Sequence, residues 1–427
     1  MPTRRLGNHP GLDPVTRGFM KILITGNGVK ELALANSFES TGEHEVLVLP
    51  GNPGTDKFAR ETGAALDCIT DRNNLIHAAE EFQPDLIVVP DEKDLTKGLA
   101  DTLRQAGFKV FGPSAANTAF LQNKTLLDEY MKKRSLLSPV RRVFGSRQEA
   151  AEWINETESP WVLQDANDSG NFAMAFSHEE AADVLEDLKQ KGTEEPMVSL
   201  FETGIRFNLP VAAAGGRCIP LQTIIIQRGV YEHEDDPQAK GAGAYCPADE
   251  VSMDEYFQAY EGSMKPLIQQ MEEDGMNYTG FITGEFVVNE RGVVCVNIKP
   301  ALPDGGTVAV MLRCRSDLAK ALDKLMDGVE TTLEWSPRHA VAVWLMAKGY
   351  PAQGSFGAPV RVDEELEGHV YAHHIADVDG NWYTDGGRVI MTAALGQTQE
   401  EAAQAAEQAA SCIHSDEALF YRTDIGR

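Results

Sequence analysis

A short glycine turn near the start of the sequence has the composition of a phosphate-binding loop. Gly26, Asn27 and Gly28 follow an apolar run and precede a helical pattern. Glycine lets the backbone approach an anion closely, and the amides at the start of a helix point toward it. The loop PGNPGT at 50–55 follows the next apolar run in the same way. The two loops together predict an anion site at one edge of a sheet.

Three other motifs with reactive residue types are not expected to form sites. DANDSG at 165–170 begins like a calcium loop, but Phe176 stands where that loop needs a glutamate. His373 and His374 are adjacent in a predicted strand, so their side chains should face opposite sides and form no metal pair. Cys246 is interpreted as a packed thiol rather than a nucleophile. The six cysteines include no CxxC pair and are expected to be reduced.

Apolar runs and helical patterns alternate through the first part of the chain. This alternation predicts an α/β fold with a parallel, doubly wound sheet, whose ligands bind at the carboxyl ends of the strands. The apolar runs lie at 21–25, 45–50, 86–90 and 109–113.

The rest of the chain predicts a mixture of helices and antiparallel strands. The last hundred residues consist mainly of short strands and turns, which favours a small, mainly β region there. We expect helices at 124–133 and 399–413 and from His178, a strand at 161–164, and a hairpin over 284–298 that turns at 289–292.

Length and charge exclude several classes of function. A chain of 427 residues is long enough for several subdomains. Its formal net charge of −27 argues against a nucleic-acid or membrane partner, since both require a basic face. No apolar run reaches the length of a membrane span, and residues 1–19 lack the apolar stretch of a signal peptide. We therefore expect a cytoplasmic protein with a disordered extension at 1–19.

The order of several motifs resembles the glycinamide ribonucleotide synthetase (phosphoribosylamine–glycine ligase) family over residues 20–427. The resemblance implies an N-terminal parallel-sheet domain at 20–120, a two-lobed ATP-grasp domain at 121–190 and 191–328, and a small α+β, mainly β, C-terminal domain at 329–427. The matching segments are GNGVKELALA at 26, PGNPGT at 50, FGPSAANTAFLQNKTL at 111, GAYCPA at 243, YTGF at 278, MLRCRSDL at 311, KGYP at 348, DGGRV at 385 and TDIG at 423.

The resemblance also implies ATP and Mg²⁺ as cofactors. The family activates an amino-acid carboxylate as an acyl phosphate, which a phosphorylated sugar amine then attacks. Lys124, Gln164 and Glu202 occupy the implied nucleotide-contacting region. Gln164 stands at a lysine position of the family, and the glycine loop that follows reads SGNFA at 169–173. A glutamine can hydrogen-bond a phosphate oxygen but supplies no charge.

The implied metal ligands are Glu285 and Asn297, and Lys299 and Asp304 are implied to act in catalysis. Lys299 replaces a ligand of the family on the same strand face as Asn297. A lysine there would repel a metal ion or replace part of its charge. Asp304 is kept in the segment PDGG, which the resemblance implies to be a loop. Its last carboxylate position has become Gly306.

The implied substrates are a phosphorylated sugar amine and an amino acid. The changed positions leave three interpretations open: a ligase of altered substrate or reduced activity, a catalytically inactive paralogue that binds or regulates a protein partner, and a sugar-phosphate sensor. The implied substrate-binding residues are Gly26, Asn27, Gly28, Glu31, Gly51, Asn52, Gly243 and Tyr245.

Overall fold

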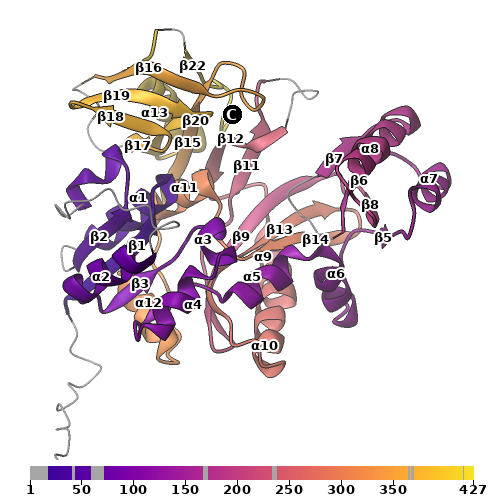
Figure 1. Cartoon of the computed structure of the whole chain (residues 1–427), viewed down its shortest axis with the longest axis horizontal. Helices are drawn as coiled ribbons and strands as arrows, with labels where there is room; N and C mark the ends of the chain where they lie inside the picture. Colours follow the sequence, from indigo (N-terminus) through magenta and orange to yellow (C-terminus); the bar gives the residue numbers. More distant parts are fainter. Residues whose placement is uncertain are drawn as a thin grey trace, which may run out of the picture.

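In the computed structural model, the described residues form five β-sheets with helices packed around them (Figure 1). Of the extension predicted at 1–19, residues 1–17 lie outside the described residues. So do residues 169–171 of the predicted glycine loop. In the described part of the chain, no helix has the length and apolar character that crossing a bilayer requires. The structure describes residues 18–40, 44–58, 72–166, 172–232, 238–363, 366, 370–416 and 418–427.

The N-terminal region is a four-stranded parallel sheet in the order β2-β1-β3-β4, which confirms the predicted architecture. Ile22, Leu23 and Ile24 are fully buried, as a continuous apolar strand covered on both faces should be. Its elements are β1 (Met20–Gly26), α1 (Val29–Glu39), β2 (His44–Pro50), a 3-10 helix (Pro53–Phe58), α2 (Arg72–Phe82), β3 (Leu86–Val88), α3 (Glu92–Thr96), α4 (Leu99–Gln105) and β4 (Val110–Phe111).

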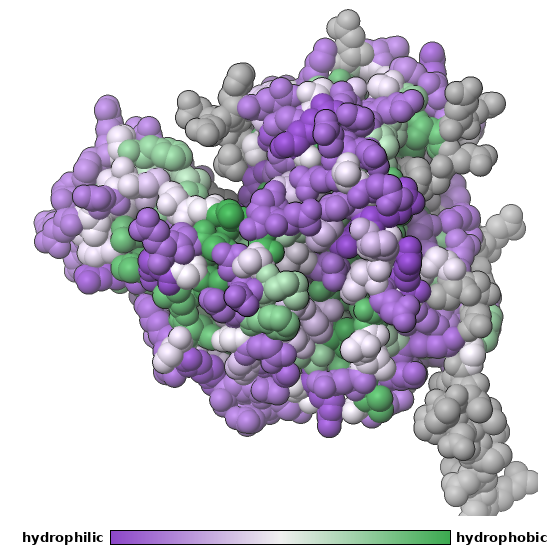
Figure 2. All heavy atoms as spheres, turned by 180° about the vertical axis from the view of Figure 1, so that it is seen from behind, coloured by the Kyte–Doolittle hydropathy of each residue, from purple (hydrophilic) through white to green (hydrophobic). Residues whose placement is uncertain are grey.

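The smaller lobe of the central region is an antiparallel sheet in the order β5-β8-β6-β7, with two helices beside it. Figure 2, seen from behind, shows this lobe standing away from the body of the molecule with a notch between them. Its elements are β5 (Arg141–Val143), α7 (Arg147–Asn155), β6 (Trp161–Asp165), β7 (Phe172–Ala175), α8 (His178–Gln190) and β8 (Pro196–Leu200).

The larger lobe is an antiparallel sheet in the order β10-β9-β13-β14. The predicted hairpin is confirmed as β13 and β14, and the predicted helix at 124–133 is confirmed as α6. Asn123 caps α6 by accepting the Leu126 N–H at 2.9 Å. The elements are α5 (Ala115–Gln122), α6 (Lys124–Lys133), β9 (Ile205–Ala214), β10 (Arg217–Pro220), α9 (Met253–Ala259), a π-helical turn (Tyr260–Met264), α10 (Lys265–Glu273), β13 (Thr279–Asn289) and β14 (Gly292–Lys299).

The C-terminal region shares a six-stranded sheet with the central region. The order of its strands is β11-β12-β15-β20-β17, and β22 pairs with β15. The first two, β11 and β12, precede residue 250 in the sequence. A second sheet has the order β18-β19-β16-β21. The elements are β11 (Ile225–Gly229), β12 (Gln238–Cys246), β15 (His339–Ala347), β16 (Ser355–Val362), β17 (Val370–Ala372), β18 (Ile375–Val378), β19 (Asn381–Gly386), β20 (Arg388–Gly396), α13 (Gln399–Ser411), β21 (Ile413–His414) and β22 (Leu419–Phe420).

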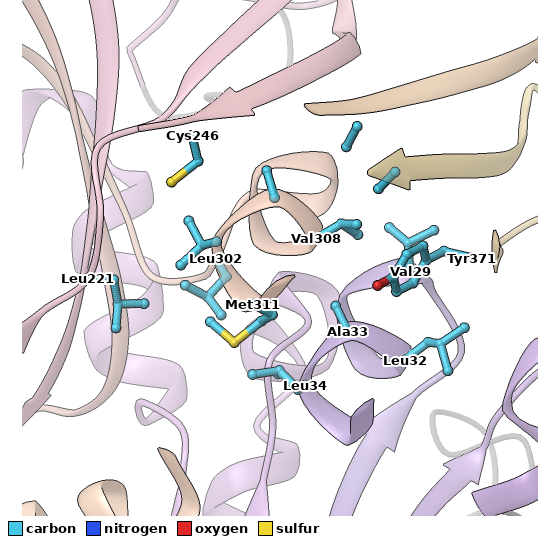
Figure 3. Packing of buried hydrophobic residues seen from close by; sticks show 14 of the residues in the cluster. Val29, Leu32, Ala33, Leu34, Leu221, Cys246, Leu302, Val308, Met311 and Tyr371 are labelled. Carbon is cyan, nitrogen blue, oxygen red and sulfur yellow. The ribbon is translucent and has the colours of Figure 1, made fainter. Parts of the chain in front are cut away.

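Helix α11 (Asp304–Arg313) joins all three regions, and α12 (Leu318–Met326) follows it. Figure 3 shows Val308 and Met311 of α11 beside Val29 and Ala33 of α1, within one buried apolar cluster. The segment PDGG is therefore not a loop, as the resemblance implied, but the start of a helix. A Cβ at Gly306 would lie 2.9 Å from the ring of Pro303 and 3.1 Å from Ile224. Close packing therefore leaves no room there for the carboxylate of the family.

Candidate active site

One end of the hairpin of β13 and β14 carries a compact polar group. Glu285 lies opposite Asn297 in the antiparallel register, and Asn297 Nδ2 donates a hydrogen bond to Glu285 Oε2 at 3.2 Å. Lys299, two residues further along β14, places Nζ 2.9 Å from Glu285 Oε1. The structure thus brings together the two predicted metal ligands and one of the residues predicted to act in catalysis.

Lys124 reaches this group from the first turn of α6. Its Nζ donates a hydrogen bond to Asn297 Oδ1 at 2.5 Å, and the residue is buried rather than a solvated surface lysine. The pKa of Lys124 is lowered to about 8, mainly by burial. The charge of Glu285 opposes this shift, and the charge of Lys299 adds to it. The ammonium is therefore still mostly protonated at neutral pH.

Arg228 of β11 is a fifth member that the sequence did not reveal. Its Nη2 lies 2.8 Å from Glu285 Oε1. Burial alone would raise the pKa of Glu285, but Lys299 and Arg228 hold it well below the usual range. No motif marks Arg228, which ends an apolar segment. We call Lys124, Arg228, Glu285, Asn297 and Lys299 the hairpin centre.

The donor set of the hairpin centre does not fit a magnesium ion. Both oxygens of Glu285 already have protein partners: Oε1 pairs with Arg228 and Lys299, and Oε2 accepts a hydrogen bond from Asn297. Asn297 Oδ1 accepts from Lys124 Nζ and from the Ile298 N–H at 2.9 Å. Mg²⁺ prefers carboxylate oxygens and water, whereas this centre has one carboxylate and three cations. Within the described ranges, no group of three or more His, Cys, Asp or Glu side chains is arranged to hold a metal ion.

The other predicted nucleotide residues lie on separate elements and already have protein partners. Gln164 of β6 directs Nε2 to the sulfur of Met197 at 3.4 Å. Glu202, between β8 and β9, accepts from Asn289 Nδ2 at 2.9 Å and pairs with Arg291. Glu202 therefore joins the segment between β8 and β9 to the turn of the hairpin. Its contact with a nucleotide stays a prediction.

The glycine turn at the end of β1 is closed by a carboxylate of the chain itself. Glu31 folds back so that Oε2 accepts the Gly28 N–H at 2.7 Å. A Cβ at either Gly26 or Gly28 would lie 2.8 Å from the Glu31 side chain. Burial raises the pKa of Glu31 to about 7. The amide of Gly28, expected to face an anionic substrate, thus already donates to Glu31.

The loop at 50–55 is bound to the glycine turn and to the C-terminal region. The Gly51 N–H donates to the Gly26 carbonyl oxygen at 3.0 Å. Asn52 Nδ2 donates to the Asn27 carbonyl oxygen at 2.7 Å and to that of Ala372 at 2.9 Å. The two predicted substrate loops therefore form one unit.

Asp304 lies at the start of α11 and is committed to ion pairs. Its Oδ1 is 3.2 Å from Lys30 Nζ, and its Oδ2 is 2.5 Å from Arg388 Nη2. Burial alone would raise the pKa of Asp304, but Lys30 and Arg388 hold it well below the usual range. Lys30 also lies 3.5 Å from Asp91. Neither Lys30 nor Arg388 was among the predicted site residues.

His373 completes this second group. It lies in a bend between β17 and β18, with its ring centroid 4.2 Å from that of His374, so the expectation of opposite faces in a strand was wrong. Burial lowers the pKa of His373 to about 3. His373 Nδ1, Glu31 Oε1 and Arg388 Nη1 are buried without a hydrogen-bond partner in the described structure. We call Lys30, Glu31, Asp304, His373 and Arg388 the junction centre.

Gly243 and Tyr245 lie on β12, where the structure gives each a packing role. A Cβ at Gly243 would meet Ile425 at 2.5 Å and a backbone oxygen of Ala342 at 2.8 Å. The Tyr245 hydroxyl lies 2.6 Å from Glu250 Oε1. Their contact with an amino-acid substrate stays a prediction.

Sequence comparison finds the same family along nearly all of the chain. Models of phosphoribosylglycinamide synthetase match residues 20–120 (N domain), 122–305 (ATP-grasp domain) and 340–427 (C domain). A phosphoribosylamine–glycine ligase of Escherichia coli O157:H7 is 30% identical over 425 residues, which cover 95% of this chain and 98% of the relative.

Structure comparison finds the same fold in more distant proteins. The phosphoribosylamine–glycine ligase of Thermotoga maritima has a TM-score of 0.79 at 22% identity, covering 95% of this chain and all of that one. The biotin carboxylase domain of 2-oxoglutarate carboxylase from Hydrogenobacter thermophilus, solved with ADP and its magnesium salt, has a TM-score of 0.68 at 14% identity. The alignment with that domain covers 94% of this chain and 91% of the domain's chain.

Proposed function

Because the chain belongs to the phosphoribosylamine–glycine ligase family of ATP-grasp carbon–nitrogen ligases, we propose that it forms an amide from a phosphorylated sugar amine and an amino acid, with altered substrates or a reduced rate. The carboxylate oxygen takes the γ-phosphoryl group of ATP, which gives an acyl phosphate and ADP. The amine nitrogen then bonds to the acyl carbon, phosphate leaves with the C–O electron pair, and the nitrogen loses a proton.

The convergence of Lys124, Arg228 and Lys299 on one end of the hairpin carries this proposal. The three cations come from three separate segments. Arg228 and Lys299 pair with Glu285, and Lys124 bonds Asn297 beside it. Protein cations at this place would hold the phosphates of ATP and stabilise the charge that develops during phosphoryl transfer. Gln164 and Glu202 are proposed to contact the same nucleotide by hydrogen bonds.

The junction centre and its two loops are proposed to receive the phosphorylated sugar amine. This is supported by the unpartnered atoms Glu31 Oε1 and Arg388 Nη1, because buried polar atoms are normally satisfied by protein, water or ligand. Gly51 and Asn52 would shape the same pocket. The amino acid is assigned to the stretch around Gly243 and Tyr245.

The division into regions is part of the proposal. An N-terminal domain at 20–120, lobes at 121–190 and 191–328, and a C-terminal domain at 329–427 are supported by the separate sheets of these parts. The shared sheet of β11, β12 and β15 connects the last two.

The experiment is a coupled assay of ADP release with ATP, phosphoribosylamine and a panel of amino acids, with mass spectrometry to identify the amide. Release of ADP that depends on both co-substrates would support the proposal. The control is Lys191→Gln, which changes an exposed lysine paired with Asp187 in the smaller lobe and should leave the rate unchanged. Nucleotide binding without any release of ADP would contradict it.

That last outcome would favour the second candidate, a catalytically inactive paralogue. The specific observations behind it are the single carboxylate of the hairpin centre and the packing that excludes a side chain at Gly306. Such a protein would keep a ligand pocket or a partner surface without completing the transfer.

A further inference from the structure

The hairpin centre places protein cations against the carboxylate that was predicted to hold the metal. Lys299 Nζ and Arg228 Nη2 lie 2.9 Å and 2.8 Å from the same oxygen, Glu285 Oε1. A divalent cation approaching that oxygen would meet two positive charges at short range. The chemistry expected from magnesium, which is neutralisation of phosphate charge, is therefore available from the chain.

The charge balance favours an anion. Lys124, Arg228 and Lys299 are accompanied by one carboxylate, Glu285, so the centre carries an excess of about two positive charges. This excess occurs in a chain whose formal net charge is −27. A local cation cluster of this kind in an acidic protein attracts an anion specifically to that place.

The exposure of the side chains shows how an anion would reach the centre. The side chains of Lys299 and Arg228 are 42% and 27% exposed, whereas that of Glu285 beneath them is 9% exposed. The carboxylate thus holds the two cations from the protein side, and their remaining N–H groups are accessible from solvent. Lysine and arginine donors bind phosphate oxygens through charge-assisted hydrogen bonds.

We propose that the hairpin centre binds the polyphosphate of a nucleotide without a divalent metal ion, with Lys299 and Arg228 in the place of magnesium. This inference rests on the proposed function, which assigns the nucleotide to the same cleft. Free ATP, which carries more negative charge than its magnesium complex, matches the centre better. Added Mg²⁺ should therefore leave binding unchanged or weaken it.

The test is calorimetric titration of the full chain with ATP and with inorganic tripolyphosphate, each in EDTA and in Mg²⁺. We expect the Kd for ATP in EDTA to equal its value in Mg²⁺ within about threefold, or to be lower. Weaker binding of tripolyphosphate would assign the site to a nucleotide, and equal binding would assign it to the polyphosphate alone. Either result supports a metal-free site.

Variants of the two cations test their contribution to ATP binding apart from any effect on the stability of the fold. Lys299→Gln and Arg228→Gln should each weaken binding of ATP in EDTA by about tenfold, since each removes a charged donor. The matched control, Lys191→Gln, should not change it. Because Lys299 is exposed, its variant should keep the thermal unfolding midpoint of the parent. The double variant Asn297→Glu, Lys299→Asn should acquire a requirement for Mg²⁺.

Two results would overturn the inference, and they differ in what else they remove. Binding of ATP in Mg²⁺ that disappears in EDTA would overturn the metal-free site and leave the proposed ligase function standing. No binding in either condition would overturn both. Unchanged affinity in Lys299→Gln and Arg228→Gln would also place the nucleotide elsewhere.

Discussion

The hairpin centre and the junction centre both combine lysine and arginine with carboxylates but differ in charge balance and exposure. Around Glu285, partly exposed cations outnumber the carboxylate. Around Asp304, the cations Lys30 and Arg388 are almost fully buried, with side chains 6% exposed, and both pair with the carboxylate. The first arrangement leaves its cations accessible to an anion from solvent. In the second, the ion pairs of Asp304 also hold three parts of the fold together, beside the pocket proposed for the sugar amine.

The largest effect should come from breaking the junction centre at Asp304. Asp304→Ala leaves Lys30 and Arg388 buried without their shared partner, which typically costs about 4 kcal/mol in unfolding free energy. Urea unfolding followed by circular dichroism measures it. The matched control is Asp187→Ala, which breaks the exposed pair with Lys191 and should cost less than about 1 kcal/mol. Equal losses in the two variants would refute the distinction between the centres.

The next effect is a pH dependence that originates at Glu31. Burial raises its pKa from 4.5 to about 7. Between these two pH values, the folded state therefore keeps a proton that the unfolded state has released. Stability from this group is therefore complete below pH 4.5 and is lost as the pH rises through about 7, by up to about 3 kcal/mol. Glu31→Gln should flatten the stability profile over that window.

The control for Glu31 is Glu180→Gln. Glu180 is an exposed glutamate that also accepts a backbone N–H just before its helix, from Phe176 at 2.8 Å. Its replacement should leave the shape of the pH profile unchanged. A profile equally steep in Glu31→Gln and in the parent would mean that the junction centre does not titrate there.

A smaller effect should follow from restoring a side chain at Gly306. Gly306→Ala places a Cβ against Pro303 and Ile224, and overpacking of this kind costs about 2 kcal/mol. Gly262→Ala is the control, because a Cβ there meets nothing within 4 Å. Thermal unfolding of both variants measures the difference. A neutral Gly306→Ala would show that α11 can accommodate the carboxylate of the family.

The smallest effect concerns the hairpin centre and has an informative sign. Glu285→Gln removes the only carboxylate there, so ATP in EDTA should bind about tenfold more tightly, or by about 1.4 kcal/mol. Calorimetry measures the change, and Glu261→Gln, which alters an exposed pair with Lys265, is the control. Weaker binding in EDTA would contradict the metal-free anion site, because no metal ion is then present for Glu285 to hold.

Local sequence patterns predicted the elements well, because those elements depend on nearby residues. The strand at 21–25, the helix at 124–133 and the hairpin turn at 289–292 all follow from periodicity or turn composition. The start of α11 at Asp304 was not predicted, because the two glycines that follow it have low helix propensity.

The members of the two centres were only partly predictable. Lys124, Glu285 and Asn297 were identified through the family motifs, and the structure brings them together. Arg228 and Arg388 were missed, because each reaches its carboxylate across more than 50 residues of sequence. Such a pairing depends on how strands are ordered in space, which no local pattern specifies.

The sheet that contains β11, β12 and β15 limits how this chain can be divided. Because β12 precedes residue 250 and pairs with β15 after residue 339, a fragment that ended between them would expose a long unpaired strand edge. Such fragments should aggregate when expressed alone. Recombination with a related protein would have to exchange β11 and β12 together with the C-terminal region, so Arg228 would be inherited with that region rather than with the lobe it serves.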